Sequence, residues 1–152
     1  MKKLFAVVMA IALMASLSVT AFAANTTGGE ADITTSIAPT YTVTIPANTT
    51  VDFNATETAF GAIEVAASQI HPDKQIRVTL TTDGELNNTI DTTKVIPYVI
   101  KDAAGAAFTT GTYLTEGDKT VLSIHITEED WNAAYAGDYT DTVTFTVSYE
   151  SK

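Results

Sequence analysis

Apolar and polar residues alternate along much of the chain beyond residue 32. A period of two places every second side chain on one face of a strand, so that one face is buried and the other meets water. The pattern occurs in the stretches 41–45, 51–53, 63–65, 76–80, 96–100, 122–126 and 139–149. We therefore expect about 7–9 mostly antiparallel strands separated by turn residues.

The last stretch has the most regular alternation. Its apolar residues share one face, and Thr and Ser occupy the other; the apolar set is Tyr139, Val143, Phe145, Val147 and Tyr149. Threonine suits exposed strand positions because branching at Cβ stiffens the side chain while the hydroxyl stays solvated. Short strands of this kind predict an all-β, immunoglobulin-like β-sandwich. Pro97 indicates an edge position or a bulge, because it cannot donate to a strand ladder.

One segment near 128–135 departs from the strand pattern and predicts a short helical turn. Thr127 can cap it, acids fill its first turn and Gly137 can end it. Trp131 and Tyr135 are four residues apart and would share a helix face, packed over the open end of the sandwich. The alternative is an aromatic platform that stacks sugar rings. Trp131, Tyr135 and Tyr139 are thus the candidate ligand-binding residues.

The first 23 residues have the layout of a signal peptide. Two lysines precede the uncharged run 4–15, and Ala21 and Ala23 fit a signal peptidase, so we expect cleavage after Ala23. A retained anchor is the alternative, because the whole uncharged run from residue 4 to residue 24 approaches the ~20 residues that span a bilayer. Residues 24–32 would then be a flexible lead and 33–152 the β-sandwich domain. The expected location is secreted, extracellular or at the cell surface.

The charge of the chain restricts its partners. The chain has 152 residues, with 8 Lys plus Arg and 18 Asp plus Glu. Loss of Lys2 and Lys3 with the signal peptide leaves 6 − 18 = −12. Nucleic acid and anionic membranes are therefore not expected as partners, since both require basic side chains. Because the sequence has no cysteine, the domain must be held by its hydrophobic core and strand pairing.

No arrangement of residues names a reaction, and we expect no enzyme and no catalytic residues. His71 and His125 have no third metal ligand nearby in sequence, so no zinc site is expected. The acids Glu128, Glu129 and Asp130 are explained by the helix dipole. We expect no cofactor; calcium is the one open alternative, with ligands from the oxygen-rich loops 83–85 and 137–141, which are otherwise simply solvated.

Two stretches resemble a known family. Residues 135–149, Tyr-Ala-Gly-Asp-Tyr-Thr-Asp-Thr-Val-Thr-Phe-Thr-Val-Ser-Tyr, resemble the closing strand of secreted bacterial surface and pilin-like β-sandwiches, including the spore coat protein U-like group. Residues 41–47 look like the first strand of similar exported domains. Members of the spore coat group usually contain cysteines, and this chain has none. The resemblance implies surface structure, adhesion or polymerisation rather than turnover.

Together these patterns predict a non-enzymatic extracellular or cell-surface structural or adhesive protein, such as a fibre or coat subunit. Its partners would be other surface proteins or copies of itself. The segment 32–37 is apolar at Ile33 and Ile37, so it could add a strand to a neighbouring subunit. The alternative is that it pairs within its own domain. A second function from a different class is a small extracellular glycan-binding module.

Overall fold

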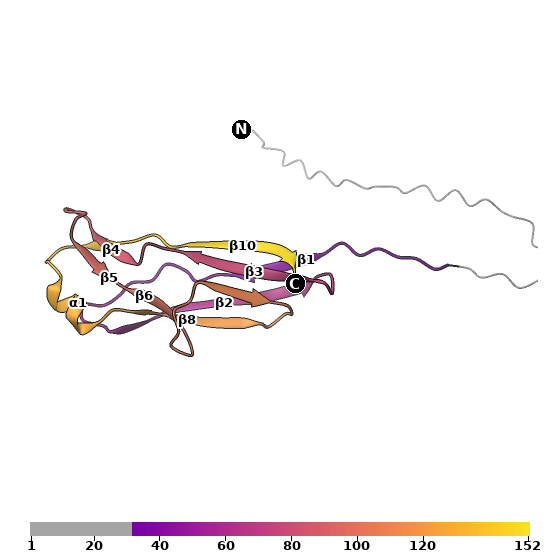
Figure 1. Ribbon diagram of the computed structural model, residues 1–152, viewed down its shortest axis with the longest axis horizontal. Helices are drawn as coiled ribbons and strands as arrows, with labels where there is room; N and C mark the ends of the chain where they lie inside the picture. Colours follow the sequence, from indigo (N-terminus) through magenta and orange to yellow (C-terminus); the bar gives the residue numbers. More distant parts are fainter. Residues whose placement is uncertain (1–31) are drawn as a thin grey trace, which may run out of the picture. The chain divides into compact units, whose positions relative to one another are not determined.

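The structure of the protein is a computed structural model that describes residues 32–152. The predicted signal peptide, residues 1–23, and most of the predicted lead, residues 24–32, lie outside the described residues. Within residues 36–152 the chain forms ten strands and one short helix, and all strand pairs are antiparallel (Figure 1). The predicted all-β sandwich is therefore confirmed.

The first sheet has four strands in the order β1-β2-β8-β6. Their bounds are β1 Thr40–Thr44, β2 Glu57–Gln69, β8 Lys119–His125 and β6 Val99–Asp102. β2 is the longest strand, and its pairing with β8 shifts between Ala59 and Gly61. Such a bulge bends a strand and changes which side chains face the core.

The second sheet has the order β10-β3-β7, and a third, smaller sheet has the order β5-β4-β9. Their bounds are β10 Thr144–Ser151, β3 Lys74–Thr81, β7 Thr110–Tyr113, β5 Val95–Pro97, β4 Glu85–Asn88 and β9 Tyr139–Thr140. The β3–β10 ladder stops at Thr81 and Thr144, and the β4–β9 ladder resumes at Asn87 and Thr140. The third sheet therefore prolongs the second beyond an interruption.

The core lies between the first and second sheets. Ile63 and Val65 of β2 and Ile76 and Val78 of β3 are fully buried and belong to one hydrophobic cluster. All four come from stretches of alternating sequence. Neighbouring residues of the same strands point to the opposite face, where several of them carry charge or hydroxyl groups. Figure 1 shows β3 and β10 as one layer and β2 and β8 as the other.

Several predicted elements differ in detail. Residues 51–53 form no strand, and the single strand expected over 139–149 is split into β9 and β10. The stretch 96–100 is split at Tyr98, where the chain leaves β5 in the small sheet and enters β6 in the first sheet. The two splits and the missing strand at 51–53 would alone give eight strands. The described residues form ten because β4 and β7 lie where no strand was expected.

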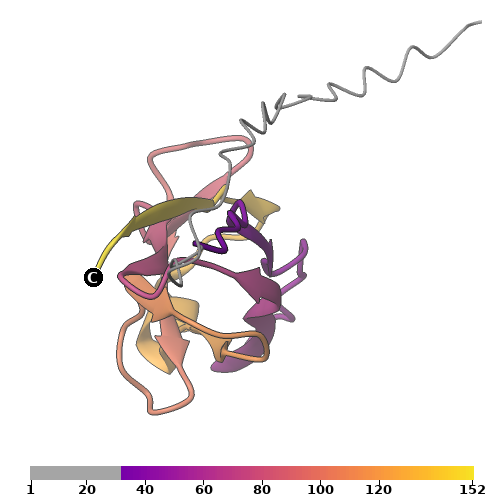
Figure 2. The same ribbon diagram turned by 90° about the vertical axis from the view of Figure 1, so that its right-hand side faces the viewer.

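The two lateral sides of the sandwich differ. On one side, residues 103–109 lead from β6 in the first sheet to β7 in the second, and the Phe108 N–H donates to the Ile100 carbonyl. On the other side lie β1 and β10, each hydrogen-bonded to one neighbour only within the described residues. The ring centroids of Tyr41 and Tyr149 lie 5.7 Å apart across this side. Figure 2 shows β10 on this side in yellow. We call it the open side.

Residues 32–39 belong to no strand. The first ladder pair of the described chain is Thr40 with Gln69. Both alternatives for residues 32–37, pairing with a neighbouring subunit or within the domain, stay predictions. Ile37 keeps a largely exposed side chain. No helix in residues 32–152 is long and apolar enough to cross a membrane.

Candidate functional site

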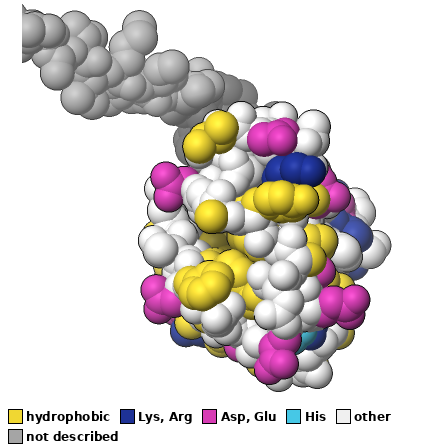
Figure 3. Space-filling model, turned by 90° about the vertical axis from the view of Figure 1, so that its left-hand side faces the viewer, with side chains coloured by type: hydrophobic (Ala, Val, Ile, Leu, Met, Phe, Trp, Pro, Cys, Tyr) yellow, Lys and Arg dark blue, Asp and Glu magenta, His cyan; other side chains and the backbone are white. Residues whose placement is uncertain are grey.

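A groove of about 1120 Å³ lies at the end of the sandwich that carries the helix. Residues 45–53 form one wall, and residues from the segment 134–145 form the other. Figure 3 looks at this end and shows hydrophobic side chains around and inside a central hollow, with acidic side chains toward the rim. Trp131, Tyr135 and Tyr139 all line the groove, so the structure brings the three candidate ligand-binding residues together.

The groove exists because strands stop early on both of its walls. β1 ends at Thr44, and Pro46 packs against the bulge of β2, where a Cβ on Gly61 would lie 3.5 Å from the Pro46 Cα. Gly61 has φ +117°, a conformation that favours glycine. On the opposite wall, Asp141–Val143 separate β9 from β10.

Apolar side chains make the floor of the groove. Those that reach it from the core cluster or pack against it are Phe60, Leu86, Ile96, Ile100, Ile124, Val143 and Phe145. The rings of Phe60 and Phe145, from the first and second sheets, have centroids 6.1 Å apart. The floor is thus continuous with the hydrophobic core, as expected of a site that buries apolar parts of a ligand.

Trp131 is fixed in place by the fold rather than presented as a free platform. It lies in α1 (Glu128–Ala133), whose predicted cap is confirmed because the Thr127 hydroxyl accepts from the Asp130 N–H. The Trp131 indole N–H donates to the Ala55 carbonyl at 3.0 Å. Its ring meets Phe53 edge-on, with centroids 5.6 Å apart at 78°. The predicted packing of Trp131 over the end of the sandwich agrees with these contacts.

Tyr135 behaves differently from its prediction. The helix ends at Ala133 and Ala134 is extended, so Tyr135 shares no helix face with Trp131. The Tyr135 side chain is 61% exposed, and the Lys94 ammonium lies 4.6 Å from its ring centroid. Among the three aromatic residues, Tyr135 offers the most accessible ring for stacking.

The Tyr139 hydroxyl is used to hold the loop after the helix. It donates to the Tyr135 carbonyl at 2.9 Å and accepts from the Tyr135 N–H at 3.1 Å. Tyr139 therefore positions Tyr135, and only its partly buried ring remains available to a ligand.

A polar cluster of Thr82, Tyr98 and Asp141 lies beside the apolar floor. The Tyr98 hydroxyl donates to the Asp141 carboxylate and lies 2.7 Å from the Thr82 hydroxyl. Burial, together with the nearby Asp141 carboxylate, raises the pKa of Tyr98 well above its usual range. Tyr98 therefore stays a neutral donor that holds Asp141 in the irregular segment between β9 and β10. No local pattern indicated the pair of Tyr98 and Asp141, whose members are 43 residues apart.

Some of the acidic residues named above, Asp83, Asp130 and Asp141, accept hydrogen bonds within the domain. In the two loops considered for calcium, Asp83 accepts from the Glu85 N–H and Asp141 accepts from Tyr98. Glu128, Glu129 and Asp130 occupy the first turn of α1 and do not line the groove. Within residues 32–152 no three His, Cys, Asp or Glu side chains form a group that could hold a metal ion. The expectation of no cofactor, with calcium as its alternative, stays a prediction.

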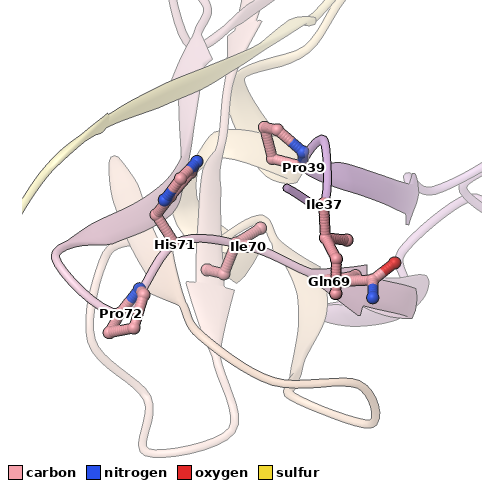
Figure 4. Close-up of a pocket in the computed structure, with 6 residues that line it drawn as sticks. All are labelled: Ile37, Pro39, Gln69, Ile70, His71 and Pro72. Carbon is pink, nitrogen blue, oxygen red and sulfur yellow. The ribbon is translucent and has the colours of Figure 1, made fainter. Parts of the chain in front are cut away.

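The two histidines lie in different parts of the domain. His71 is in the β2–β3 turn, beside a small pocket of about 230 Å³ (Figure 4). Its backbone N–H donates to the Tyr149 hydroxyl. His125 is on β8, with Nδ1 3.6 Å from Glu57. Hydrogen bonding by the Ser123 hydroxyl, and secondarily the charge of His125, lowers the pKa of Glu57.

No known protein-family model matches the chain, and no curated protein matches its sequence closely enough to indicate a family. The fold and the groove therefore define a class only: an all-β sandwich with one open side and an apolar groove at one end.

Proposed function

We propose that the chain is a non-enzymatic extracellular or cell-surface structural or adhesive protein that acts as a subunit of a fibre or coat. The observation that carries the proposal is the open side, where β1 and β10 each have an edge that no strand of residues 32–152 pairs with. Their inward residues Tyr41 and Val147 are each 37% exposed. Free edges with uncovered apolar side chains are templates for strand addition by another chain.

The proposed partners are copies of the chain or other surface proteins. Association through strand edges uses backbone hydrogen bonds and apolar contacts, and it needs no reactive group. The export signal expected at residues 1–23 and the resemblance to secreted surface proteins support a location outside the cytoplasm. The excess of acidic residues supports solubility there.

Expression of the full sequence in a bacterial host tests the proposal. We expect the protein in the medium or on the cell surface, with Ala24 at its N-terminus by mass spectrometry. Analytical ultracentrifugation and electron microscopy should then show assemblies larger than a dimer, as a fibre or coat requires. A protein that stays in the cytoplasm, or that is exported and remains monomeric without adhering to any surface, would contradict it.

One observation favours glycan binding as a second function. The exposed ring of Tyr135 stands at the wall of an apolar groove, and sugar rings stack on such aromatic faces. If a glycan array gives a ligand, Tyr135→Ala should abolish binding, whereas Tyr135→Phe should keep most of it because the ring remains. Equal binding by Tyr135→Ala and the parent chain would exclude this site.

A further inference from the structure

The outer edge of β10 is the longest free edge on the open side. β10 pairs residue for residue with β3, from Thr144 opposite Thr81 to Ser151 opposite Lys74, without a bulge. It has eight residues, whereas β1 beside it has five and a register shift. Within residues 32–152, β10 has no strand on its other side.

The backbone groups at this edge follow from the hydrogen-bond pattern. The Lys152 N–H donates to the carbonyl of Asp73, the residue before β3 begins, so Lys152 and every second residue before it face β3. The intervening residues Phe145, Val147 and Tyr149 therefore direct their N–H and C=O groups away from β3, to the free edge.

The side chains of the same three residues point toward the core. Each lies opposite a buried residue of β3: Leu80, Val78 and Ile76 respectively. Directly opposite residues share a sheet face. Val78 is 0% exposed, whereas Val147 is 37% exposed, because no strand of residues 32–152 pairs with the outer edge of β10. The edge thus combines unpaired backbone groups with uncovered apolar surface.

β10 also lacks the usual protection of an edge strand. Natural edges carry Lys, Pro or a bulge that blocks pairing with another chain, and residues 144–151 contain none of these. Their single charge, Glu150, accepts hydrogen bonds from Arg77 and Gln75 of β3. Two copies of a chain with so large an excess of Asp and Glu over Lys and Arg repel each other. At the β10 edge this repulsion is reduced, because the charge of Glu150 is compensated by Arg77 of the same copy.

We propose that β10 pairs antiparallel with β10 of a second copy, about a two-fold axis at Val147. This register places Val147 opposite its equivalent and Phe145 opposite Tyr149 of the second copy, so that all three outward-directed residues are hydrogen-bonded. On the outer face, Thr146 meets Ser148 of the second copy. Glu150 meets Thr144, so no like charges are opposed. The inference rests on the proposed function and names the first partner within it.

Disulfide trapping tests the register, because the chain has no cysteine of its own. Opposite residues of an antiparallel pair lie close enough for a disulfide. The Thr146→Cys and Ser148→Cys variants, purified from a secreting host, mixed and mildly oxidised, should give a covalent dimer. The matched control mixes Thr110→Cys with Thr112→Cys, which lie on the same sheet face at the opposite edge strand β7. The control should give no dimer.

A charge variant tests the interface without a cross-link. Thr146→Lys with Ser148→Lys puts like charges opposite each other twice across the axis. The dissociation constant of the dimer, measured by ultracentrifugation, should rise about tenfold or more. Thr110→Lys with Thr112→Lys makes the same charge change on β7 and should leave it unchanged. An unchanged denaturation midpoint in both variants shows that the fold is intact.

Three results would overturn the inference. The first is a monomer at every accessible concentration. The second is trapping of Thr146→Cys by Thr35→Cys rather than by Ser148→Cys, which would show residues 32–37 of another copy at the edge. The third is a dimer that both lysine variants leave intact.

The inference and the proposed function can fail separately. Fibres or coats that form normally with the β10 lysine variant would contradict this inference and leave the proposed function intact. A β10 dimer that neither assembles further nor adheres would contradict the proposed function and leave the inference intact.

Discussion

At the scale of single residues, Trp131 shows how a residue can be assigned correctly and its neighbours missed. The sequence predicted that Trp131 packs over the end of the sandwich. Its actual partners, Phe53 and the Ala55 carbonyl, lie more than seventy residues earlier. No local pattern links such distant segments, and Phe53 itself was expected in a strand.

These contacts predict the cost of changing Trp131. Trp131→Phe keeps most of the packing but leaves the Ala55 carbonyl without its donor, which should destabilise the fold by about 1 kcal/mol. Trp131→Ala also removes the ring from the hydrophobic cluster and should cost about 2–4 kcal/mol. Urea denaturation of both variants measures the difference. If Trp131→Ala has the parent midpoint, the indole contributes nothing to stability.

Gly137 is a second residue whose position depends on distant structure. It has φ +145°, and a Cβ there would lie 2.5 Å from the Asn88 side-chain nitrogen. Asn88 is buried, and its side-chain oxygen accepts from the Ile90 and Asp91 N–H groups. A substitution at Gly137 therefore strains the backbone and displaces an amide that holds the loop after β4.

We expect Gly137→Ala to lower stability by about 2–3 kcal/mol, from backbone strain and the clash together. Gly105→Ala is the matched control, because Gly105 also has a positive φ, +82°, but no atom lies within 4 Å of its Cβ position. It should cost about 1 kcal/mol. Equal losses in thermal or urea unfolding would mean that the contact with Asn88 has no energetic weight.

At the scale of elements, alternation located strands well and their interruptions poorly. β1, β3 and β8 lie where apolar residues alternate, because one buried face is a local property of the sequence. The break at 141–143 was not predicted, since it depends on the bonds of Asp141 to Tyr98 and Thr82. The four-residue strand β7 was missed because Thr-Gly-Thr-Tyr is too short to show a period.

The candidate site was predictable to a similar extent. Its helix-side wall, with Trp131, Tyr135 and Tyr139, was identified from aromatic residues near a capped turn. The opposite wall, residues 45–53, has no repeating pattern, and only Pro46 marked the end of β1. A groove between two irregular segments is a product of tertiary structure, so its existence could not be deduced from either segment alone.

At the scale of the whole molecule, the surface carboxylates set the response to acid. Hydrogen bonds from the Leu114 and Thr115 N–H groups lower the pKa of Asp118, and those from Arg77 and Gln75 lower the pKa of Glu150. A depressed pKa in the folded state means that the stabilisation is complete above the unfolded pKa. It is lost as the pH falls through the folded value.

We therefore expect the urea midpoint to hold near neutral pH and to decline as the pH falls below about 4.5, the ordinary value for glutamate. Asp118→Asn should flatten part of this decline. Glu116→Gln, in the same loop, is the control because Glu116 accepts no side-chain hydrogen bond among the described residues. An acid response that is identical in both variants would show that Asp118 is not its source.

The asymmetry between the two lateral sides limits how the molecule can grow. Residues 103–109 link the sheets on one flank, and the other flank is the open side. If two copies join there about a two-fold axis, the β10 edge of each copy is occupied by the other. No β10 edge remains for a third copy, so this contact ends at a dimer. A longer polymer would then have to alternate between two unlike junctions, the second lying at an end of the sandwich rather than along its flank.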